Sequence, residues 1–446
     1  MSDTTSARSG RQRSHVASRR DFLRQSVLTG VTAATVELGL AHSVHAAGSD
    51  LLRVALIGAG GRGAGAADNI LNTKANAKLV AVADAFEDRI ATSVKSLAER
   101  HPDRVDVPEE RQFTGLDSYQ KAIACDVDLV LLCAPPGFRP AHFEAAVSAG
   151  KHVFMEKPVA TDSPGVRRIL AANQVAKQKG LAVAVGHHLR HETKHQEVVN
   201  RIHDGAIGDV KFVRVYFNTS GIWNRPRKPG QTEMEYQVQN WYHFTWLSGD
   251  HLVEQHVHDI DVGNWIQRAH PVQAQGMGGR QVRCQPGIGE IFDHHSIEFI
   301  YADGSRMISY CRQIPNCWNS FSQHAHGTKG YAGIEGHGAS TLHIDGQEPL
   351  NWKRTADGHQ VEMDDLVAAL QAGQPYNEAD WATESTMTAI LGRMATYSGN
   401  MVDWDVALAS QLDLGPSRLA WDAEPKSKPD ANGVYPCAIP GVTQAW

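Results

Sequence analysis

The stretch LLRVALIGAGGRG, residues 51–63, decides the fold of this chain. Its first seven residues form a short apolar run of the kind that makes a buried strand. Gly58, Gly60 and Gly63 follow directly in the pattern G-x-G-x-x-G, and an alanine-rich stretch to about Leu71 has helical composition. The order strand, glycine turn, helix is typical of a dinucleotide site. The first glycine turns the chain, the second admits a pyrophosphate and the third lets the helix pack closely.

A second apolar run, residues 78–83, ends at Asp84. In dinucleotide sites an acid roughly 20 residues beyond the glycine turn bonds the adenosine ribose hydroxyls and repels a 2'-phosphate. We therefore expect NAD as the cofactor, held by the three glycines and Asp84. Arg62 and Arg89 are nearby cations that leave NADP as the less favoured alternative.

Strand and helix patterns continue to alternate along the first half of the chain. An apolar run at 127–133 has strand character, and residues 141–150 have helical character. Such alternation predicts a parallel sheet, so the fold class is α/β with an N-terminal Rossmann domain at 51–186. Ligands of these sheets bind at the carboxyl ends of the strands. Further cofactor-binding candidates at this edge are Pro135, Glu156 and Arg62.

The second half of the chain predicts an α+β substrate domain at 187–415 with an open, mainly antiparallel sheet. We expect the protein to form a homo-oligomer through this sheet. A polar, proline-containing C-terminal arm follows at 416–446. The expected strands are 210–218, 296–301, 307–311 and 331–334, and the expected helices are 362–372 and 381–398.

The first 46 residues differ in composition from the rest and contain most of their charge as arginine. Arg19 and Arg20 precede Phe22-Leu23, an apolar run at 26–40 follows, and small residues surround Ala46. This order resembles a twin-arginine signal peptide over residues 1–46, which implies export to the periplasm. The alternative is a disordered basic tail. Because Glu37 interrupts the apolar run, we expect no stable membrane span.

Composition excludes several other classes of function. A formal net charge of −6 and a sequence pI of about 6.4 argue against nucleic acid as a partner, because phosphate binding needs clustered lysine and arginine. The six cysteines contain no C-x-x-C pair, so neither a zinc ribbon nor a dithiol redox motif is indicated.

Three further motifs follow in order: Glu156-Lys157-Pro158, GHHLR at 186–190 and GRMA at 392–395. With the glycine turn, they resemble the Gfo/Idh/MocA oxidoreductase family over residues 51–408. The resemblance implies a carbohydrate substrate and places Lys157 beside the nicotinamide, bonded to the hydroxyl that is oxidised. A cation there would stabilise a developing alkoxide.

The stretch GDHLVEQHVHDID, residues 249–261, has helical spacing. On one helix Glu254 and His258 would share a face, so Glu254 could orient His258 as a general base. The family's D-x-x-x-H pattern falls on these two positions, with Glu254 in place of the usual Asp. We expect no metal, because helical H-x-H directs its two rings apart and hydride chemistry needs none.

Other residues are candidates for the substrate pocket, although each also suits a structural role. His187, His188 and Arg190 follow an expected strand and could instead form a domain junction. Trp241 and Tyr242 could stack on a sugar ring or belong to a core.

We therefore expect an NAD-dependent oxidoreductase that takes a hydride from a hydroxyl carbon of a sugar, polyol or glycoside. A redox-neutral glycosidase, which oxidises, eliminates and reduces again with bound NAD, is the first alternative. A non-catalytic NAD-binding sensor is the second, but it has no need of Lys157 with Glu254 and His258.

Overall fold

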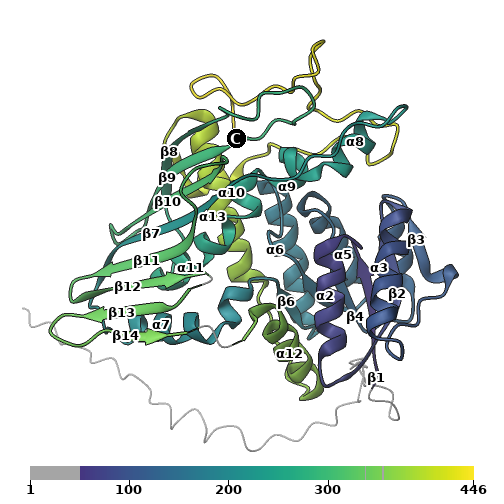
Figure 1. The fold of residues 1–446 in the computed structure, drawn as a ribbon, viewed down its shortest axis with the longest axis horizontal. Helices are drawn as coiled ribbons and strands as arrows, with labels where there is room; N and C mark the ends of the chain where they lie inside the picture. Colours follow the sequence, from purple (N-terminus) through teal and green to yellow (C-terminus); the bar gives the residue numbers. More distant parts are fainter. Residues whose placement is uncertain (1–50, 337, 354–355) are drawn as a thin grey trace, which may run out of the picture. The chain divides into compact units, whose positions relative to one another are not determined.

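Six parallel strands in the order β3-β2-β1-β4-β5-β6 form the first sheet of the computed structural model (Figure 1). The structure describes residues 51–336, 338–353 and 356–446, so the predicted leader at 1–46 lies outside the described residues. The strands are β1 (Leu51–Ile57), β2 (Asn76–Asp84), β3 (Gln112–Thr114), β4 (Leu129–Leu132), β5 (His152–Met155) and β6 (Val183–Val185). The helices between them are α2 (Gly61–Asn72), α3 (Glu87–Arg100), α4 (Ser118–Ala124), α5 (Arg139–Ser148) and α6 (Ser163–Gln178).

The central strands of this sheet are covered on both faces, which explains their unbroken apolar runs. Alternate residues of β1 enter two different cores: Val54 and Leu56 pack on one face, and Ala55 and Ile57 on the other. A helix from much later in the chain, α12 (Gly358–Gln371), completes one of these cores and packs against α2. The helical cover of the first sheet therefore does not come from the first half of the sequence alone.

Nine strands form the second sheet in the order β14-β13-β12-β11-β7-β10-β9-β8-β15. All neighbouring pairs are antiparallel except β7 and β10, which run parallel. Its strands are β7 (Val210–Thr219), β8 (Gln273–Gly279), β9 (His294–Ile300), β10 (Arg306–Gln313), β11 (Ser320–Gly327), β12 (Gly330–Glu335), β13 (Ser340–Ile344), β14 (Leu350–Trp352) and β15 (Val402–Asp403). The predicted fold class, a Rossmann domain with an open, mainly antiparallel sheet, is confirmed.

Helices α11 (Val257–Gln267) and α13 (Ala379–Ser398) cover one face of this sheet (Figure 1). The strands alternate accordingly: Met307 and Cys311 of β10 are buried, whereas Tyr310 between them is exposed. On the outer face Tyr310 stacks with Tyr216, and Trp318 packs edge-on against the Tyr216 ring. The second sheet therefore presents aromatic side chains to the outside.

The last residues, 416–446, contain no helix or strand, but they do not extend away from the protein. Tyr435 is 2% exposed and packs with Phe244, their ring centroids 5.0 Å apart. The predicted surface arm is thus partly anchored. Within the described ranges, no helix combines the length and apolar character needed to cross a membrane.

Candidate active site

A cavity of about 640 Å³ lies at the carboxyl ends of the first sheet's strands, where ligands of parallel sheets bind. Both halves of the described chain contribute to its walls. From the first half the lining includes Gly58, Gly60, Arg62, Gly63, Asp84, Pro135, Glu156 and Lys157. From the second half it includes Trp241, Tyr242, Glu254 and His258. The structure thus brings together most of the residues that the sequence singled out.

The glycine turn leaves no room for side chains at two of its three key positions. Gly58 has a φ of +94°, and a Cβ there would lie 2.3 Å from the Ala134 nitrogen. A Cβ on Gly63 would lie 1.8 Å from the Gly58 carbonyl oxygen. Gly60 precedes the first turn of α2, whose free N–H groups are suited to a phosphate. The cradle fits a dinucleotide pyrophosphate.

Asp84 ends β2 at the edge of the same cavity. Its carboxylate accepts backbone hydrogen bonds from Ala59 at 2.7 Å and Phe86 at 2.9 Å, which fix it beside the glycine turn. Burial raises the pKa of Asp84, and these two backbone donors act against that rise. The position fits an acid that accepts the ribose hydroxyls.

Arg62 points away from Asp84 and toward the end of β5. Its Nε donates to Glu156 Oε1 at 2.6 Å, and its Nη2 lies 3.8 Å from Glu362 Oε1 on α12. Burial, followed by the charge of Glu156, raises the pKa of the Glu362 carboxyl well above its ordinary value. Arg62 is therefore engaged by two acids, which weakens its candidacy as a 2'-phosphate ligand. Glu362 was not foreseen, because nothing in its local sequence marks it.

The stretch 249–261 does not form the single helix that its spacing predicts. Helix α10 (His251–Glu254) ends, and α11 begins at Val257. His256 interrupts the ladder: its ring bonds Asp259 at 3.1 Å and the Ser309 hydroxyl at 2.8 Å. The backbone N–H of His258 bonds the Gln255 carbonyl instead of that of Glu254. The carbonyl of Glu254 is thus released from the helix.

Lys157 binds the backbone carbonyl of Glu254 that the helix break leaves free. Its ammonium donates to the Glu254 backbone oxygen and to Glu254 Oε1, the latter at 3.0 Å. Both side chains are largely buried, with 10% and 12% of their surfaces exposed. The expectation that Glu254 orients His258 is wrong for this structure. Glu254 holds Lys157 instead, because the helix break turns its carbonyl and carboxylate toward β5.

His258 belongs to a group of imidazoles at this end of the cavity. Its ring meets that of His188 edge-on with centroids 4.8 Å apart, and His188 stacks on His359 at 4.0 Å. Among the described residues, Nδ1 of His258 has no hydrogen-bond partner. Burial, and then the charge of Lys157, holds the pKa of His258 well below its ordinary value. The imidazole is therefore neutral at pH 7 and able to accept a proton.

The remaining pocket candidates divide into two groups. Trp241 and Tyr242 line the cavity, and burial, followed by Glu254, raises the pKa of the Tyr242 hydroxyl well above its ordinary value. Arg190 does not line it: the guanidinium binds Asp261 with two hydrogen bonds of 2.8 and 2.9 Å. It also lies 3.7 Å over the Trp381 ring.

His187 and His188 lie behind the cavity wall rather than on it. His187 is 1% exposed, with its ring 5.3 Å from that of Trp381 and 6.0 Å from that of His258. The domain-junction interpretation therefore suits His187 and Arg190, whereas His188 supports His258 from behind. Arg89, which the sequence named as a cation near the cofactor, also lines the cavity. The sequence missed several lining residues that carry no local signal: Phe217, Trp223, Arg225, Gln255 and His359.

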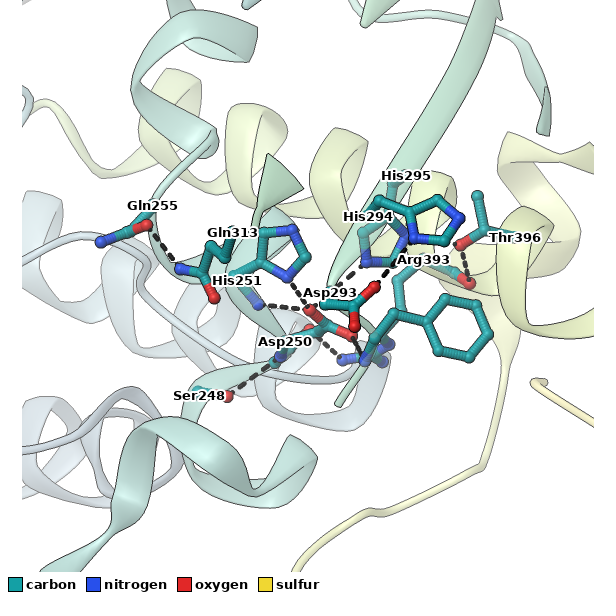
Figure 2. Close-up of polar contacts among 12 residues, drawn as sticks. Ser248, Asp250, His251, Gln255, Asp293, His294, His295, Gln313, Arg393 and Thr396 are labelled. Carbon is teal, nitrogen blue, oxygen red and sulfur yellow. Dashed lines mark hydrogen bonds and ion pairs between the residues drawn. The ribbon is translucent and has the colours of Figure 1, made fainter. Parts of the chain in front are cut away.

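A buried cluster around Asp250 anchors the start of α10 (Figure 2). Asp250 has a φ of +79°, and its Oδ2 accepts from the Phe292 N–H at 3.0 Å and the Tyr397 hydroxyl at 2.6 Å. Nitrogens of His251 and His295 lie 2.7 and 3.3 Å from Oδ1. These three side chains lie close enough to hold a metal ion. Because the carboxylate already accepts two hydrogen bonds, we interpret the cluster as an anchor.

A separate hydrogen bond joins the second sheet to the cavity wall. Gln313 of β10 donates to Gln255 Oε1 at 2.8 Å, and Gln255 lines the cavity (Figure 2). His251 does not line the cavity, because its ring lies against Asp250.

Part of the chain matches a known family, and most of its length is similar to a known enzyme. Residues 52–187 match the family described as "Oxidoreductase family, NAD-binding Rossmann fold", GFO_IDH_MocA. Inositol 2-dehydrogenase of Rhizobium meliloti (strain 1021) is 26% identical over 333 residues, which cover 72% of this chain and 89% of that enzyme.

Two solved structures show the same fold across most of the chain. Aldose-aldose oxidoreductase from Caulobacter crescentus, complexed with glycerol, has a TM-score of 0.62 at 20% identity and covers 79% of this chain and 99% of its own. GenD2 from gentamicin A biosynthesis, in complex with NAD, has a TM-score of 0.61 at 20% identity, covering 80% of this chain and 97% of its own. Residues 52–187 thus match the NAD-binding Rossmann domain of the Gfo/Idh/MocA oxidoreductases, and the chain is similar over most of its length to an NAD-dependent class of sugar and polyol oxidoreductase.

Proposed function

We propose that this protein oxidises a hydroxyl carbon of a sugar, polyol or glycoside. The observation that carries the proposal is the placement of Lys157 and His258 in one cavity with the glycine turn and Asp84. The relative named inositol 2-dehydrogenase agrees with a polyhydroxylated substrate. The polar lining around Lys157 and His258 agrees with it too. Carboxylate, ammonium, amide and imidazole groups there surround a space suited to several hydroxyls.

NAD bound along the glycine turn and Asp84 would accept a hydride. Lys157 provides the positive charge that stabilises oxygen as the substrate hydroxyl loses its proton. Its contacts with the carbonyl and carboxylate of Glu254 fix the direction of the ammonium. One donor hydrogen remains on Nζ for the substrate oxygen, since an ammonium has three.

His258 is the group that takes the proton in this proposal. A general base must be neutral when the reaction starts, and the depressed pKa of His258 meets that requirement at pH 7. His188, which itself stacks on His359, covers one side of the His258 ring. Because Nδ1 is buried, the nitrogen that meets the substrate in this proposal is Nε2, and the active tautomer carries its proton on Nδ1.

The experiment is to incubate the purified protein with NAD and a panel of sugars, polyols and glycosides. Absorbance of reduced nicotinamide and mass spectrometry of the sugars are followed together. We expect a keto-sugar to form in step with NADH. Released aglycone without accumulating NADH would favour the redox-neutral glycosidase, and tight NAD binding without any product would favour the sensor.

We also propose that the protein is exported by the twin-arginine route, on the basis of Arg19, Arg20 and the small residues before Ala46. Replacing both arginines with lysine should strand the precursor inside the cell. Equal amounts of mature periplasmic protein from both versions would contradict this. The exposed aromatic face of the second sheet supports self-association, which light scattering would test.

A further inference from the structure

The segment from Gly221 to Asn240 joins β7 of the second sheet to the helices before α10, and it reaches the cofactor end of the cavity. Trp223 and Arg225 of this segment line the cavity together with Phe86 and Arg89 of the first half. Nothing in the glycine motif or the catalytic motifs accounts for them. The cavity wall opposite the glycine turn is therefore partly supplied by the second half of the chain.

Buried side chains hold this segment in place by its backbone. Asn240 is fully buried; its Oδ1 accepts from the Arg225 N–H at 2.7 Å, and its Nδ2 donates to the Arg225 carbonyl at 3.0 Å. The buried His243 bonds the Trp223 carbonyl through Nε2 at 2.7 Å. Two buried polar groups thus fix the backbone at the two residues whose side chains enter the lining.

The Arg225 guanidinium is oriented by its neighbours, and the carboxylate of Asp88 acts on it only at longer range. It lies 4.5 Å over the Trp223 ring and donates to the Gln239 carbonyl at 3.1 Å. In the part of the chain that the structure describes, neither Arg225 nor Arg89 forms an ion pair. The pKa of Arg225 is lowered, first by partial burial and then by the nearby charge of Arg89.

Arg89 lies directly above the glycine turn. Its Nη1 is 3.2 Å from the position that a Cβ on Gly60 would occupy. Two guanidinium groups of like charge therefore line the cavity beside the turn that fits a pyrophosphate. Their mutual repulsion is relieved when an anion lies between them. Arginine is also the side chain best suited to pair with phosphate oxygens.

We propose that Arg225 binds the pyrophosphate of the dinucleotide from across the cavity, opposite the glycine turn and together with Arg89. Cofactor binding then bridges the two halves of the protein, and the segment 221–240 lies over the dinucleotide. This inference rests on the proposed NAD-dependent function, because an anion at the glycine turn is required.

The test is the affinity of the purified protein for NAD and for ADP-ribose, measured by calorimetry after removal of any bound nucleotide. Arg225→Gln should weaken both by about tenfold, as expected for a lost hydrogen bond to a charged group. Arg225→Lys should retain part of the affinity. The matched control is Arg227→Gln on the same segment, since Arg227 pairs with Glu233 and does not line the cavity.

Each outcome has a distinct meaning. Unchanged NAD affinity in Arg225→Gln, with a melting temperature like that of the control, would overturn the inference. A loss confined to NADP would also overturn it, because the contact would then be to a 2'-phosphate. If the wild type binds no NAD, the proposed function fails instead. A loss in Arg225→Gln that Lys partly restores cannot be explained by misfolding and would support the contact.

Discussion

The two ends of the cavity are built differently. At the cofactor end Gly58, Gly63 and Asp84 act through neighbouring backbone, and each contact lies within one turn or one strand pair. At the substrate end Lys157 meets Glu254, a residue 97 positions away. Short-range motifs therefore define the cofactor, whereas distant pairings assemble the chemistry. A local sequence pattern is therefore enough to identify the cofactor site. For the substrate end it identifies candidate residues but not which of them contact one another.

The largest effect is expected at the substrate end, at Lys157. Lys157→Ala removes the cation from the reacting hydroxyl and should reduce kcat by roughly 100- to 1,000-fold, the range for losing one group that stabilises developing negative charge. NAD affinity should stay close to that of the wild type, because the dinucleotide contacts are elsewhere. Steady-state kinetics and calorimetry check the two statements. An equal loss of NAD affinity would contradict the assignment of Lys157 to the substrate rather than to the cofactor.

Glu254→Gln is the sharpest test of the substrate end, because the sequence and the structure assign Glu254 different partners. Glutamine keeps the backbone carbonyl contact with Lys157 but loses the charge, so kcat should fall by about tenfold. The acid limb of the pH profile, which reports His258, should not move. A displaced limb would show that Glu254 acts through His258 after all.

Asp84→Ala should affect only the cofactor end. The substitution removes a carboxylate that would accept ribose hydroxyls and repel a 2'-phosphate, so NAD should bind about tenfold more weakly while NADP is spared. Calorimetry with both nucleotides gives the answer. Tighter binding of NADP than NAD by the wild type would contradict the assignment.

The smallest expected effect is a shift of the acid limb of the pH-rate profile to lower pH. His258 must be neutral to accept a proton, and burial together with Lys157 lowers its pKa below the ordinary 6.5. The rate of oxidation should therefore not decline as the pH falls through 6.5, and its acid limb should appear only at lower pH. A kcat/KM profile measures this. An acid limb at or above 6.5 would rule out the depressed pKa.

The first sheet was predictable because its strands are apolar on both faces and its glycine turn has few alternative uses. Its completion by α12 was not, since Met363 and Leu366 are ordinary helix residues whose packing partners lie some 300 positions earlier. The break at Gln255 and His256 was hidden for a similar reason. It depends on Ser309 of β10, which accepts or donates the hydrogen bond that holds His256 out of the helix ladder.

The lining residues Trp223, Arg225 and His359 carry no spacing that marks a site. Only the three-dimensional return of their segments to the first sheet brings them to the cavity. Glu254 is a similar case, because helical spacing pairs it with His258 whereas the folded chain pairs it with Lys157.

The central claim is that hydride passes from a hydroxyl carbon to NAD while Lys157 holds the reacting oxygen. The most direct measurement uses a substrate found in the panel, deuterated at the carbon that is oxidised, with mass spectrometry of the nicotinamide after a single turnover. We expect deuterium in the nicotinamide ring with the wild type and none with Lys157→Ala at matched NAD occupancy. Product formed by the wild type without deuterium in the nicotinamide would contradict the claim.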